Sequence, residues 1–276
     1  MRARTLRRAG WDAIAAAAFL LMVFPIYWMV ATALKPGRDI LTLNPVWFPL
    51  RPTLENFASA MAVPFFWNDV VNSLLIVSAT VVISVVLAFL AAVAVARFRF
   101  RGRTAVLAML IGVQMVPLGA LVIPIFLFLD SISLTDTLVG VVLTYLAFVL
   151  PFMTWTLRGF VVTVPLELEE QAMTDGCTRM SAFLRIVFPL VAPGLVATSV
   201  YAFIQAWNEY IIAYVLLRSN GNQTITVWLA SFTTSHGTDW GGLMAGATLA
   251  ALPVVAFFLI VQRRMVSGLT AGAVKG

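Results

Sequence analysis

The segment Leu166–Cys177 reads LELEEQAMTDGC and lies between two strongly apolar stretches of the sequence. It holds four of the twelve acidic residues of the chain, Glu167, Glu169, Glu170 and Asp175. Pro165 suits the first position of a helix, where its missing N–H has no partner to lose. Acidic side chains in the first turns are favoured by the helix dipole, and Gly176 can adopt the left-handed conformation that ends a helix. The segment therefore predicts a short acidic helix that ends in a sharp bend.

A second helix is predicted to start near Thr178, directly after the bend. Met180, Phe183, Leu184 and Val187 follow it at the i, i+3, i+4, i+7 spacing of one apolar helix face. The pair could lie flat on the membrane, but such helices usually carry a basic polar face, and the inner leaflet is negative. The acidic front favours instead a groove on another protein that buries the apolar face.

Composition places these helices in an integral membrane protein. Of 276 residues, 61% are hydrophobic and 11% charged, whereas soluble domains are about half apolar and about one quarter charged. A spanning helix needs about 20 mostly apolar residues. Six such runs predict an all-α protein with one transmembrane domain over 1–276. The predicted spans are 13–34, 74–96, 104–129, 138–157, 187–207 and 243–261.

Basic residues are distributed unevenly between the segments that connect these spans. Fourteen of the eighteen Lys and Arg residues fall on one side: Arg2, Arg4, Arg7, Arg8, Arg97, Arg99, Arg101, Arg103, Arg158, Arg179, Arg185, Arg263, Arg264 and Lys275. The positive-inside rule predicts that both termini are cytoplasmic. Topology thus accounts for the net charge of +6, and we expect no nucleic-acid partner. The first apolar run, about 22 residues, exceeds the 7–15 of a cleaved signal, so we expect an anchor that stays.

Several classes of function are disfavoured by the residues present. Single residues of cysteine and histidine, Cys177 and His236, exclude an intrachain disulfide and a cluster of histidines around a metal. An enzyme needs a nucleophile–base pair or a metal cluster, and neither is visible. An ion-coupled secondary transporter usually keeps charged residues inside its spans, and the six predicted spans have none. An assembly subunit without a pore stays open.

Neutral polar residues inside the predicted spans are candidates for lining a solute path. They are Gln114, Thr144, Tyr145, Thr154, Thr156, Tyr201 and Gln205. Polar groups facing lipid are costly, and donors and acceptors mixed with aromatic rings suit an uncharged sugar or polyol. The alternative is that they bond across helix contacts. Glu209, just beyond Trp207, is interpreted equally well as an interface anchor and as a gating or structural residue.

The stretch EEQAMTDGCTRMSAFLRIVFPLVAP, residues 169–193, resembles the EAA loop of bacterial ABC importer permeases. The residues that match the pattern in register are Glu170, Ala172, Asp175, Gly176, Ile186 and Pro189. Gln171 and Cys177 replace alanines, and Phe188 replaces a leucine. The whole chain is similar to the six-span member of carbohydrate importer permease pairs of the maltose type, through ALKPGRDI, PTLENF, VVNSLLIVS, VARFRFRGR, QAWNEY and the ending GLTAGAVKG.

This resemblance implies a multi-pass subunit of the bacterial cytoplasmic membrane that takes up a sugar; a glycerol 3-phosphate importer is the alternative. Its partners would be a second permease subunit, two copies of a cytoplasmic ATPase and a solute-binding protein outside. This chain would bind no cofactor and no metal, because ATP and Mg²⁺ would sit in the ATPase. The absence of a G-x-x-x-x-G-K-[ST] phosphate loop from the sequence agrees with that division.

The resemblance also implies roles for particular residues. The loop 158–186, between spans four and five, would carry the coupling helix, with Glu169, Glu170, Ala172, Asp175, Gly176 and Pro189 coupling to the ATPase. The tail 262–276 would reach the ATPase through Gly268, Thr270, Gly272 and Lys275. The last outer loop would touch the binding protein through His236, Asp239 and Trp240.

Overall fold

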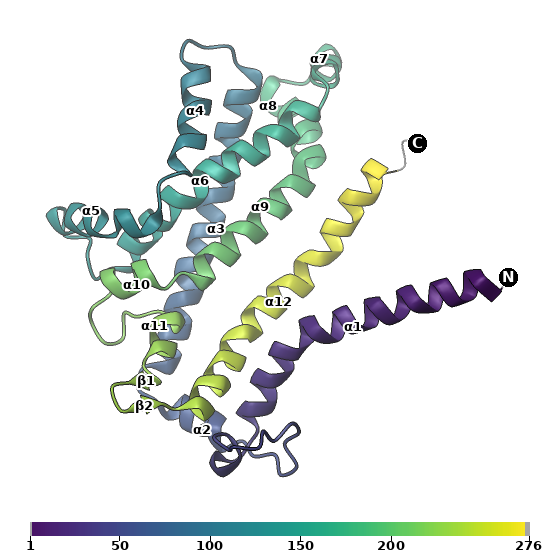
Figure 1. The fold of residues 1–276 in the computed structure, drawn as a ribbon. Helices are drawn as coiled ribbons and strands as arrows, with labels where there is room; N and C mark the ends of the chain where they lie inside the picture. The colour runs from purple at the N-terminus through teal and green to yellow at the C-terminus, as the bar shows by residue number, and fades with distance from the viewer. Residues whose placement is uncertain (1, 274–276) are drawn as a thin grey trace. The chain divides into compact units, whose positions relative to one another are not determined.

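The computed structural model describes the backbone of residues 2–273 and the side chains of residues 10–262. In that part of the chain every element is helical except for one two-stranded hairpin (Figure 1). The elements are α1 (Arg2–Ala33), η1 (Gly37–Asp39), α2 (Glu55–Ala62), α3 (Phe66–Arg97), α4 (Arg103–Val113), α5 (Leu118–Ser131), α6 (Leu138–Thr163), α7 (Leu166–Thr174), α8 (Arg179–Ala182), the π-helical turn η2 (Phe183–Val187), α9 (Phe188–Asn208), α10 (Ile211–Leu216), α11 (Ile225–Ala230), β1 (Thr233–Thr234), β2 (Gly237–Thr238) and α12 (Trp240–Ala273).

The described helices include five that are long and apolar enough to cross a membrane. They are Gly10–Ala33, Phe66–Arg97, Leu138–Thr163, Arg179–Asn208 and Trp240–Gln262. The bent pair α4 and α5 would make a sixth span if it is counted as one. The prediction of an all-α integral membrane protein is therefore confirmed.

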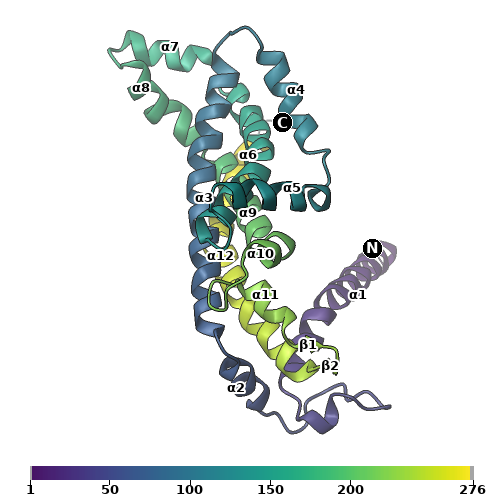
Figure 2. The ribbon, with the colours of Figure 1, turned by 90° about the vertical axis from the view of Figure 1, so that its left-hand side faces the viewer.

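The predicted span 104–129 is not one straight helix. It breaks between Val113 and Leu118, and the axes of α4 and α5 differ by 104° (Figure 2). Pro117 has no N–H to donate, and a proline disfavours the helical conformation in the residue before it, here Val116. The sequence analysis predicted one span here, and the structure has two helices separated by a complete break.

Two other helices extend beyond the predicted spans. α3 begins eight residues before residue 74, so Asp69 lies in its first turn rather than in a loop, and the carboxyl group is buried. α12 begins at Trp240 and continues to Ala273, so most of the predicted tail 262–276 has a helical backbone. Span predictions follow the length of an apolar run, whereas a helix can continue into polar sequence wherever its backbone stays hydrogen-bonded.

The chain forms two compact units. The first comprises the chain up to Phe66 together with Trp228–Leu252. In it, the amide of Asn56 on α2 donates to the carbonyls of Ala33 and Lys35, both at 2.8 Å, and so fixes the end of α1. The Lys35 ammonium lies 3.9 Å from the ring centroid of Trp28. Burial lowers the pKa of Lys35 below its ordinary 10.5, although the charge of Asp39 opposes this shift.

The second unit comprises Trp67–Val227 and the chain from Pro253. Its apolar core lies where α3, α6, η2 and α9 meet. The buried core residues are Ala88, Phe89, Ala92, Val149, Met153, Leu157, Val161, Val164, Val187, Val191, Leu195 and Ala202. α6 and α9 approach closely at Gly194, where an added Cβ would lie 2.5 Å from Cγ of Phe160. The core thus connects α6 and α9 to α3 next to the segment that carries α7.

Candidate functional site

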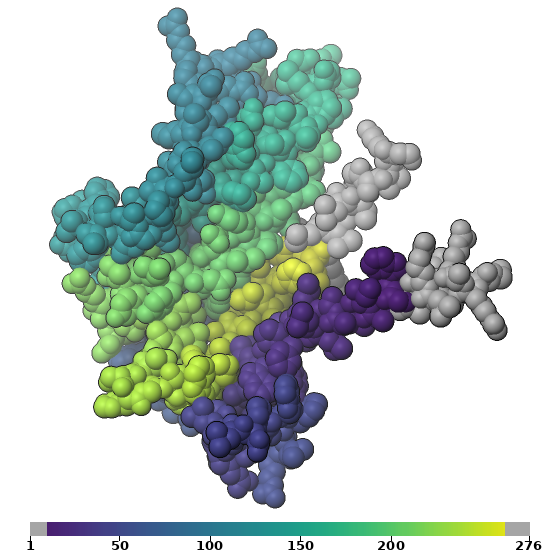
Figure 3. Space-filling model, in the orientation of Figure 1, coloured from purple at the N-terminus to yellow at the C-terminus, as the bar shows by residue number. Residues whose placement is uncertain are grey.

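The acidic segment forms a short helix at one end of the second unit, on its surface (Figures 1 and 3). α7 begins at Leu166, and Pro165 is the residue before it, with φ −59° and ψ 135°. The prediction that Pro165 is the first helical residue is therefore wrong by one position. Glu167 and Glu169 fall in the first turn, where the helix dipole favours negative charge.

Gly176 ends α7 as predicted. Its φ is +90°, a left-handed conformation that is strained for residues with a Cβ. The N–H of Cys177 donates to the carbonyl of Ala172 at 3.0 Å, and the N–H of Gly176 donates to that of Met173 at 3.1 Å. These two bonds form a Schellman motif, which satisfies carbonyls at the helix end. The Thr178 hydroxyl then accepts from the N–H of Ser181 and caps α8, so the predicted bend between two short helices is confirmed.

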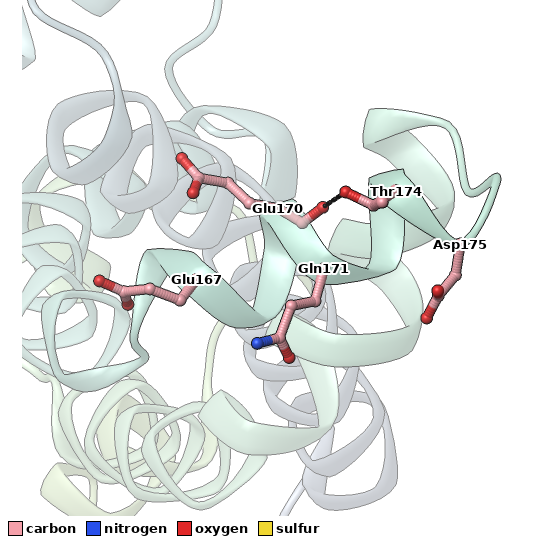
Figure 4. A pocket seen from close by; sticks show the side chains of 5 residues that line it. All are labelled: Glu167, Glu170, Gln171, Thr174 and Asp175. Atoms are coloured by element: carbon pink, nitrogen blue, oxygen red, sulfur yellow. Dashed lines mark hydrogen bonds between the residues drawn. The ribbon is translucent and has the colours of Figure 1, made fainter.

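One face of α7 is entirely polar. Glu167, Glu170, Gln171 and Thr174 follow the i, i+3, i+4, i+7 spacing, and together with Asp175 they line a hollow of about 540 Å³ (Figure 4). All five are exposed. In the described part of the chain no ion pair involves Glu167, Glu170 or Asp175. This face therefore presents three carboxylates without a cationic partner in the structure.

Glu169 differs from its acidic neighbours, because it faces into the second unit. Its Oε1 lies 2.7 Å from Nη2 of Arg97, the last residue of α3. The two side chains are 16% and 15% exposed, respectively. The sequence analysis grouped Glu169 with the coupling residues and considered Arg97 only for topology, because this contact joins residues that are remote in sequence.

The segment after α8 connects the bend to the core. η2 is a π-helical turn in which the N–H of Phe188 reaches back to the carbonyl of Phe183. Pro189 follows at the start of α9, and its ring lacks an N–H and crowds the carbonyl four residues earlier, which accounts for the widened turn. Phe183 stacks on Phe89 of α3 at 5.1 Å. Of the predicted apolar face, Val187 and Phe183 pack inward, while Met180 and Leu184 are exposed.

The polar residues proposed for a solute path have varied environments. Gln114 lies at the break after α4, and its amide donates to the carbonyl of Phe148 at 3.3 Å. Tyr145 and Thr154 are buried in α6. On α9, Tyr201 packs on Phe152 at 4.1 Å, and it is hydrogen-bonded to the exposed Gln205 one turn later.

The residues proposed for contact with a binding protein lie around the hairpin and the start of α12. His236 is exposed in the hairpin turn, and Trp240 is an exposed residue at the beginning of α12. Asp239 caps α12 by accepting from the N–H of Gly242 at 3.1 Å. Of the residues proposed for the tail, Gly268, Thr270 and Gly272 fall where the structure describes no side chains, and Lys275 lies outside the described residues.

Glu209 has a structural role that the sequence analysis could not separate from its alternative. Its carboxylate accepts from the Tyr145 hydroxyl at 2.8 Å and from the N–H groups of Ile212 and Ala213 at 2.8 and 3.0 Å. Its carbonyl accepts from the hydroxyl of Thr226 at 2.8 Å. Glu209 thus holds the ends of α6, α9, α10 and α11 together.

Asp136, just before α6, was missed by the sequence analysis. Its carboxylate accepts from the N–H groups of Arg218 and Ser219, at 2.9 and 3.0 Å, and from the Ser219 hydroxyl. Burial alone would raise the pKa of Asp136, but these bonds and the amide of Asn222 outweigh it and hold the pKa below the ordinary 3.8. Its φ of 54° is a left-handed value that Asp tolerates better than most residues. The residue type therefore suits this turn, but nothing nearby in the sequence indicates the bonds to Arg218 and Ser219.

Within the described residues no group of three or more His, Cys, Asp or Glu side chains could hold a metal ion. The features of α7 instead suit contact with a macromolecule. An exposed helix with unpaired carboxylates offers acceptors for basic side chains, and the Schellman motif fixes the C-terminal end of this one.

Comparisons with known proteins agree with this architecture. Residues 84–270 match the family described as binding-protein-dependent transport system inner membrane component. The diacetylchitobiose uptake system permease protein DasC of Streptomyces coelicolor is 46% identical over 274 residues, 99% of each chain. The trehalose transport system permease protein SugB of Mycobacterium tuberculosis is 37% identical over 256 residues, 92% of this chain and 93% of that protein.

A solved bacterial ABC transporter involved in the import of the acidic polysaccharide alginate contains a chain with the same fold. Its TM-score is 0.79 at 20% sequence identity, over 95% of this chain and 98% of that chain. Proteins of the matched family are transport components rather than catalysts. From the family match and the membrane-spanning helices, this chain belongs to the binding-protein-dependent transport system inner membrane components, as a permease subunit of an ABC transporter.

Proposed function

We propose that this chain is the permease subunit of an ABC importer that carries a mono- or oligosaccharide across the cytoplasmic membrane. The names of two relatives, an uptake system for diacetylchitobiose and a transport system for trehalose, support a carbohydrate substrate. Both are neutral disaccharides, which fits the neutral polar side chains of Gln114, Tyr201 and Gln205 as contacts along the path, whereas Tyr145 and Thr154 are buried within this chain.

The proposed orientation puts both termini and α7 in the cytoplasm. Seven arginines support it: Arg97, Arg99, Arg101, Arg103, Arg158, Arg179 and Arg185 all lie near the ends of α3 and α6 that adjoin α7, or just after α7. The opposite end of α6 has only Arg218 nearby, in the loop that Asp136 holds. Cytoplasmic segments of membrane proteins carry such an excess of basic residues.

The observation that carries the proposal is the polar face of α7. Its carboxylates are exposed, and none of them forms an ion pair with a described residue. The Schellman motif caps its C-terminal end, which suits a surface that a basic cleft on another protein receives. We propose that this partner is the cytoplasmic ATPase, two copies of which serve this chain and a second permease subunit. ATP and Mg²⁺ then belong to the ATPase.

The proposed mechanism is mechanical. Closure of the ATPase pair on ATP moves α7, which is joined to α6 through Val164 and Pro165 and to α9 through α8 and η2. α6 and α9 pack on each other at Gly194, so they move as a pair and change the access of the cavity between permease subunits. A solute-binding protein delivers the sugar to the opposite side, near His236, Asp239 and Trp240. Coupling between distant sites requires such an element with two discrete arrangements.

The test is purification of the tagged chain in mild detergent after co-expression with neighbouring genes. We expect ATPase activity to elute with the wild-type chain. Asp175→Arg should lose it by reversing charge on the polar face, and Gly176→Pro should uncouple it by disturbing the bend. Glu55→Arg, an exposed acid on α2, is the control and should retain the ATPase. Recovery of wild-type chain without any ATPase would contradict the proposal.

The substrate class is tested in proteoliposomes that contain the complete complex. We expect ATP-dependent uptake of a labelled neutral disaccharide, such as trehalose, when the binding protein is present. Uptake of glycerol 3-phosphate instead would assign the same machinery to a phosphoester and would contradict the carbohydrate assignment alone.

A further inference from the structure

The guanidinium of Arg97 joins the ends of three helices. Arg97 is the last residue of α3, and its Nη2 donates to the carbonyl of Val164 at 2.8 Å and lies 2.7 Å from Oε1 of Glu169. Val164 caps the C-terminal end of α6, and Glu169 lies in the first turn of α7. A single side chain thus contacts α6 and α7 from α3.

The local charges favour this arrangement. Arg97 lies in the last turn of α3 and against the last carbonyls of α6, where cations are stabilised, while Glu169 lies near the N-terminus of α7, where anions are stabilised. Both side chains are about one-sixth exposed, so solvent and salt screen the pair less than an exposed one. The guanidinium can serve two acceptors at once, which a lysine ammonium does with less defined geometry.

The rest of α7 is weakly held by this chain. None of its residues, Leu166–Thr174, all of which are described, is buried, and Leu166 and Leu168 are 48% and 38% exposed. Its covalent connections are also not rigid helix. Val164 and Pro165 are extended on one side, and Gly176 has a left-handed conformation on the other. The contact with Arg97 therefore supplies an orientation that backbone and packing do not.

We propose that Arg97 is a positioning residue, which ties α7 to α3 so that a displacement of α7 moves α3 together with α6 and α9. The inference rests on the proposed function, because it assumes that the ATPase drives α7. It gives Glu169 a role inside this chain and leaves Glu167, Glu170 and Asp175 for the partner. Loss of the contact lets α7 pivot at Pro165 and Gly176 while its polar face stays intact.

The experiment uses the complete importer in proteoliposomes, with the second permease subunit, the ATPase and the binding protein. The readouts are sugar transported per ATP hydrolysed and the amount of ATPase that co-purifies. For Arg97→Gln we expect the transport-to-hydrolysis ratio to fall by about fivefold or more, the usual size of an allosteric coupling, with the ATPase still bound. Arg99→Gln, which changes an exposed arginine two residues later, is the matched control and should keep the wild-type ratio.

The two acceptors of Arg97 make the inference sharper. Arg97→Gln removes contacts to both Val164 and Glu169, whereas Glu169→Gln removes only the ion pair. We therefore expect Glu169→Gln to lower the ratio less, and the double variant to match Arg97→Gln. Arg97→Lys should restore part of the ratio, because it keeps a charge that can reach Glu169. Amide hydrogen exchange of α7 should be faster in Arg97→Gln and partly restored in Arg97→Lys.

The outcomes separate this inference from the proposed function. If the wild-type chain recruits no ATPase, the proposed function fails. If wild type is coupled and Arg97→Gln keeps both the wild-type ratio and the wild-type exchange rate, only the positioning role is overturned. Additive effects of Arg97→Gln and Glu169→Gln would also overturn it, because two residues acting through one contact cannot add. Loss of the ATPase from Arg97→Gln would overturn it as well, by showing that the residue serves docking.

Discussion

Acidic residues at the two ends of α6 behave in opposite ways, although the residue types are the same. Near its C-terminal end, α7 exposes Glu167, Glu170 and Asp175, and no cation among the described residues pairs with them. Near its N-terminal end, Glu209 and Asp136 each accept several hydrogen bonds from neighbouring segments. α6 has 26 residues, so these regions lie about 39 Å apart.

The difference separates acidic residues that stabilise the fold of this chain from acidic residues that are exposed for binding to a partner protein. Glu209 and Asp136 are half-buried, so hydrogen bonds must replace part of the hydration of their carboxylates, and such groups stabilise the fold around them. An exposed carboxylate keeps its water and contributes little to the fold, so it is free to bind a partner. The number of internal donors to each carboxylate therefore predicts which of two properties a substitution will change, stability or assembly.

The largest effect on stability is expected for Glu209→Ala. It leaves the buried hydroxyl of Tyr145 and the N–H groups of Ile212 and Ala213 without their acceptor. Unpaired buried donors to a charged group cost about 3 kcal/mol or more. We expect the melting temperature of the detergent-solubilised chain to fall by about 10 °C, measured by thermal unfolding.

Tyr145→Phe is the matched control for Glu209→Ala, because it removes one of the three donors and leaves the two backbone bonds. Its melting temperature should fall by less than half as much. Equal losses in Tyr145→Phe and Glu209→Ala would show that the N-terminal cap of α10 contributes nothing, and the comparison between the two ends of α6 would then lose its strongest case.

The second largest effect on stability is expected at Gly194, where α9 packs closely against Phe160 of α6. A Cβ there would lie 2.5 Å from Cγ and 2.6 Å from Cδ2 of the Phe160 ring. Overpacking of this kind costs about 1–3 kcal/mol, so Gly194→Val should lower the melting temperature by several degrees. The second-site change Phe160→Ala makes room and should recover part of the loss, and failure to recover any would contradict the packing at this crossing.

Local signals explain what the sequence analysis predicted correctly. Long apolar runs identify five spans, because crossing a membrane imposes a minimum length on a helix. The bend after α7 follows from Gly176 and Thr178, whose cap preferences act within a few residues. The sequence analysis predicted α7 as a short acidic helix, and the spacing of Glu167, Glu170 and Gln171 places these residues on one face of it.

The contacts that distinguish one acid from another could not be predicted in this way. Tyr145 and Glu209 are 64 positions apart, and Asp136 and Arg218 are 82 apart, so their pairing depends on how α6 and α9 pack. Glu169 and Glu170 are adjacent and chemically alike, yet of the two only Glu169 forms an ion pair with a described residue. The break at Pro117 shows a similar limit, since α5 contains Pro124 and remains helical through it.

A smaller, pH-dependent effect is expected at Asp136. Because hydrogen bonds hold its folded-state pKa below the ordinary 3.8, the charged form contributes stability above that pH and loses it as pH falls through the folded-state pKa. Asp136→Asn keeps a residue type that tolerates the left-handed backbone and removes the charge together with one of the two accepting oxygens. It should cost about 1–2 kcal/mol at neutral pH. The measurement is thermal unfolding between pH 7 and pH 3, in which the difference between wild type and variant should narrow toward the acidic end. A constant difference would show that ionisation of Asp136 is not the cause.

The smallest effect on stability is expected for the double variant Glu167→Gln with Glu170→Gln. These side chains are exposed, and the hydrogen bond from the Thr174 hydroxyl to Glu170 uses the backbone carbonyl, which the substitution retains. Exposed substitutions of this kind change stability by about 0.5 kcal/mol or less, so the melting temperature should stay within about 2 °C of wild type.

ATPase recovered with the variant should nevertheless fall, because two of the three unpaired carboxylates are gone. A variant that melted well below wild type while it retained its ATPase would reverse the comparison, since the exposed acids would then stabilise this chain rather than its assembly.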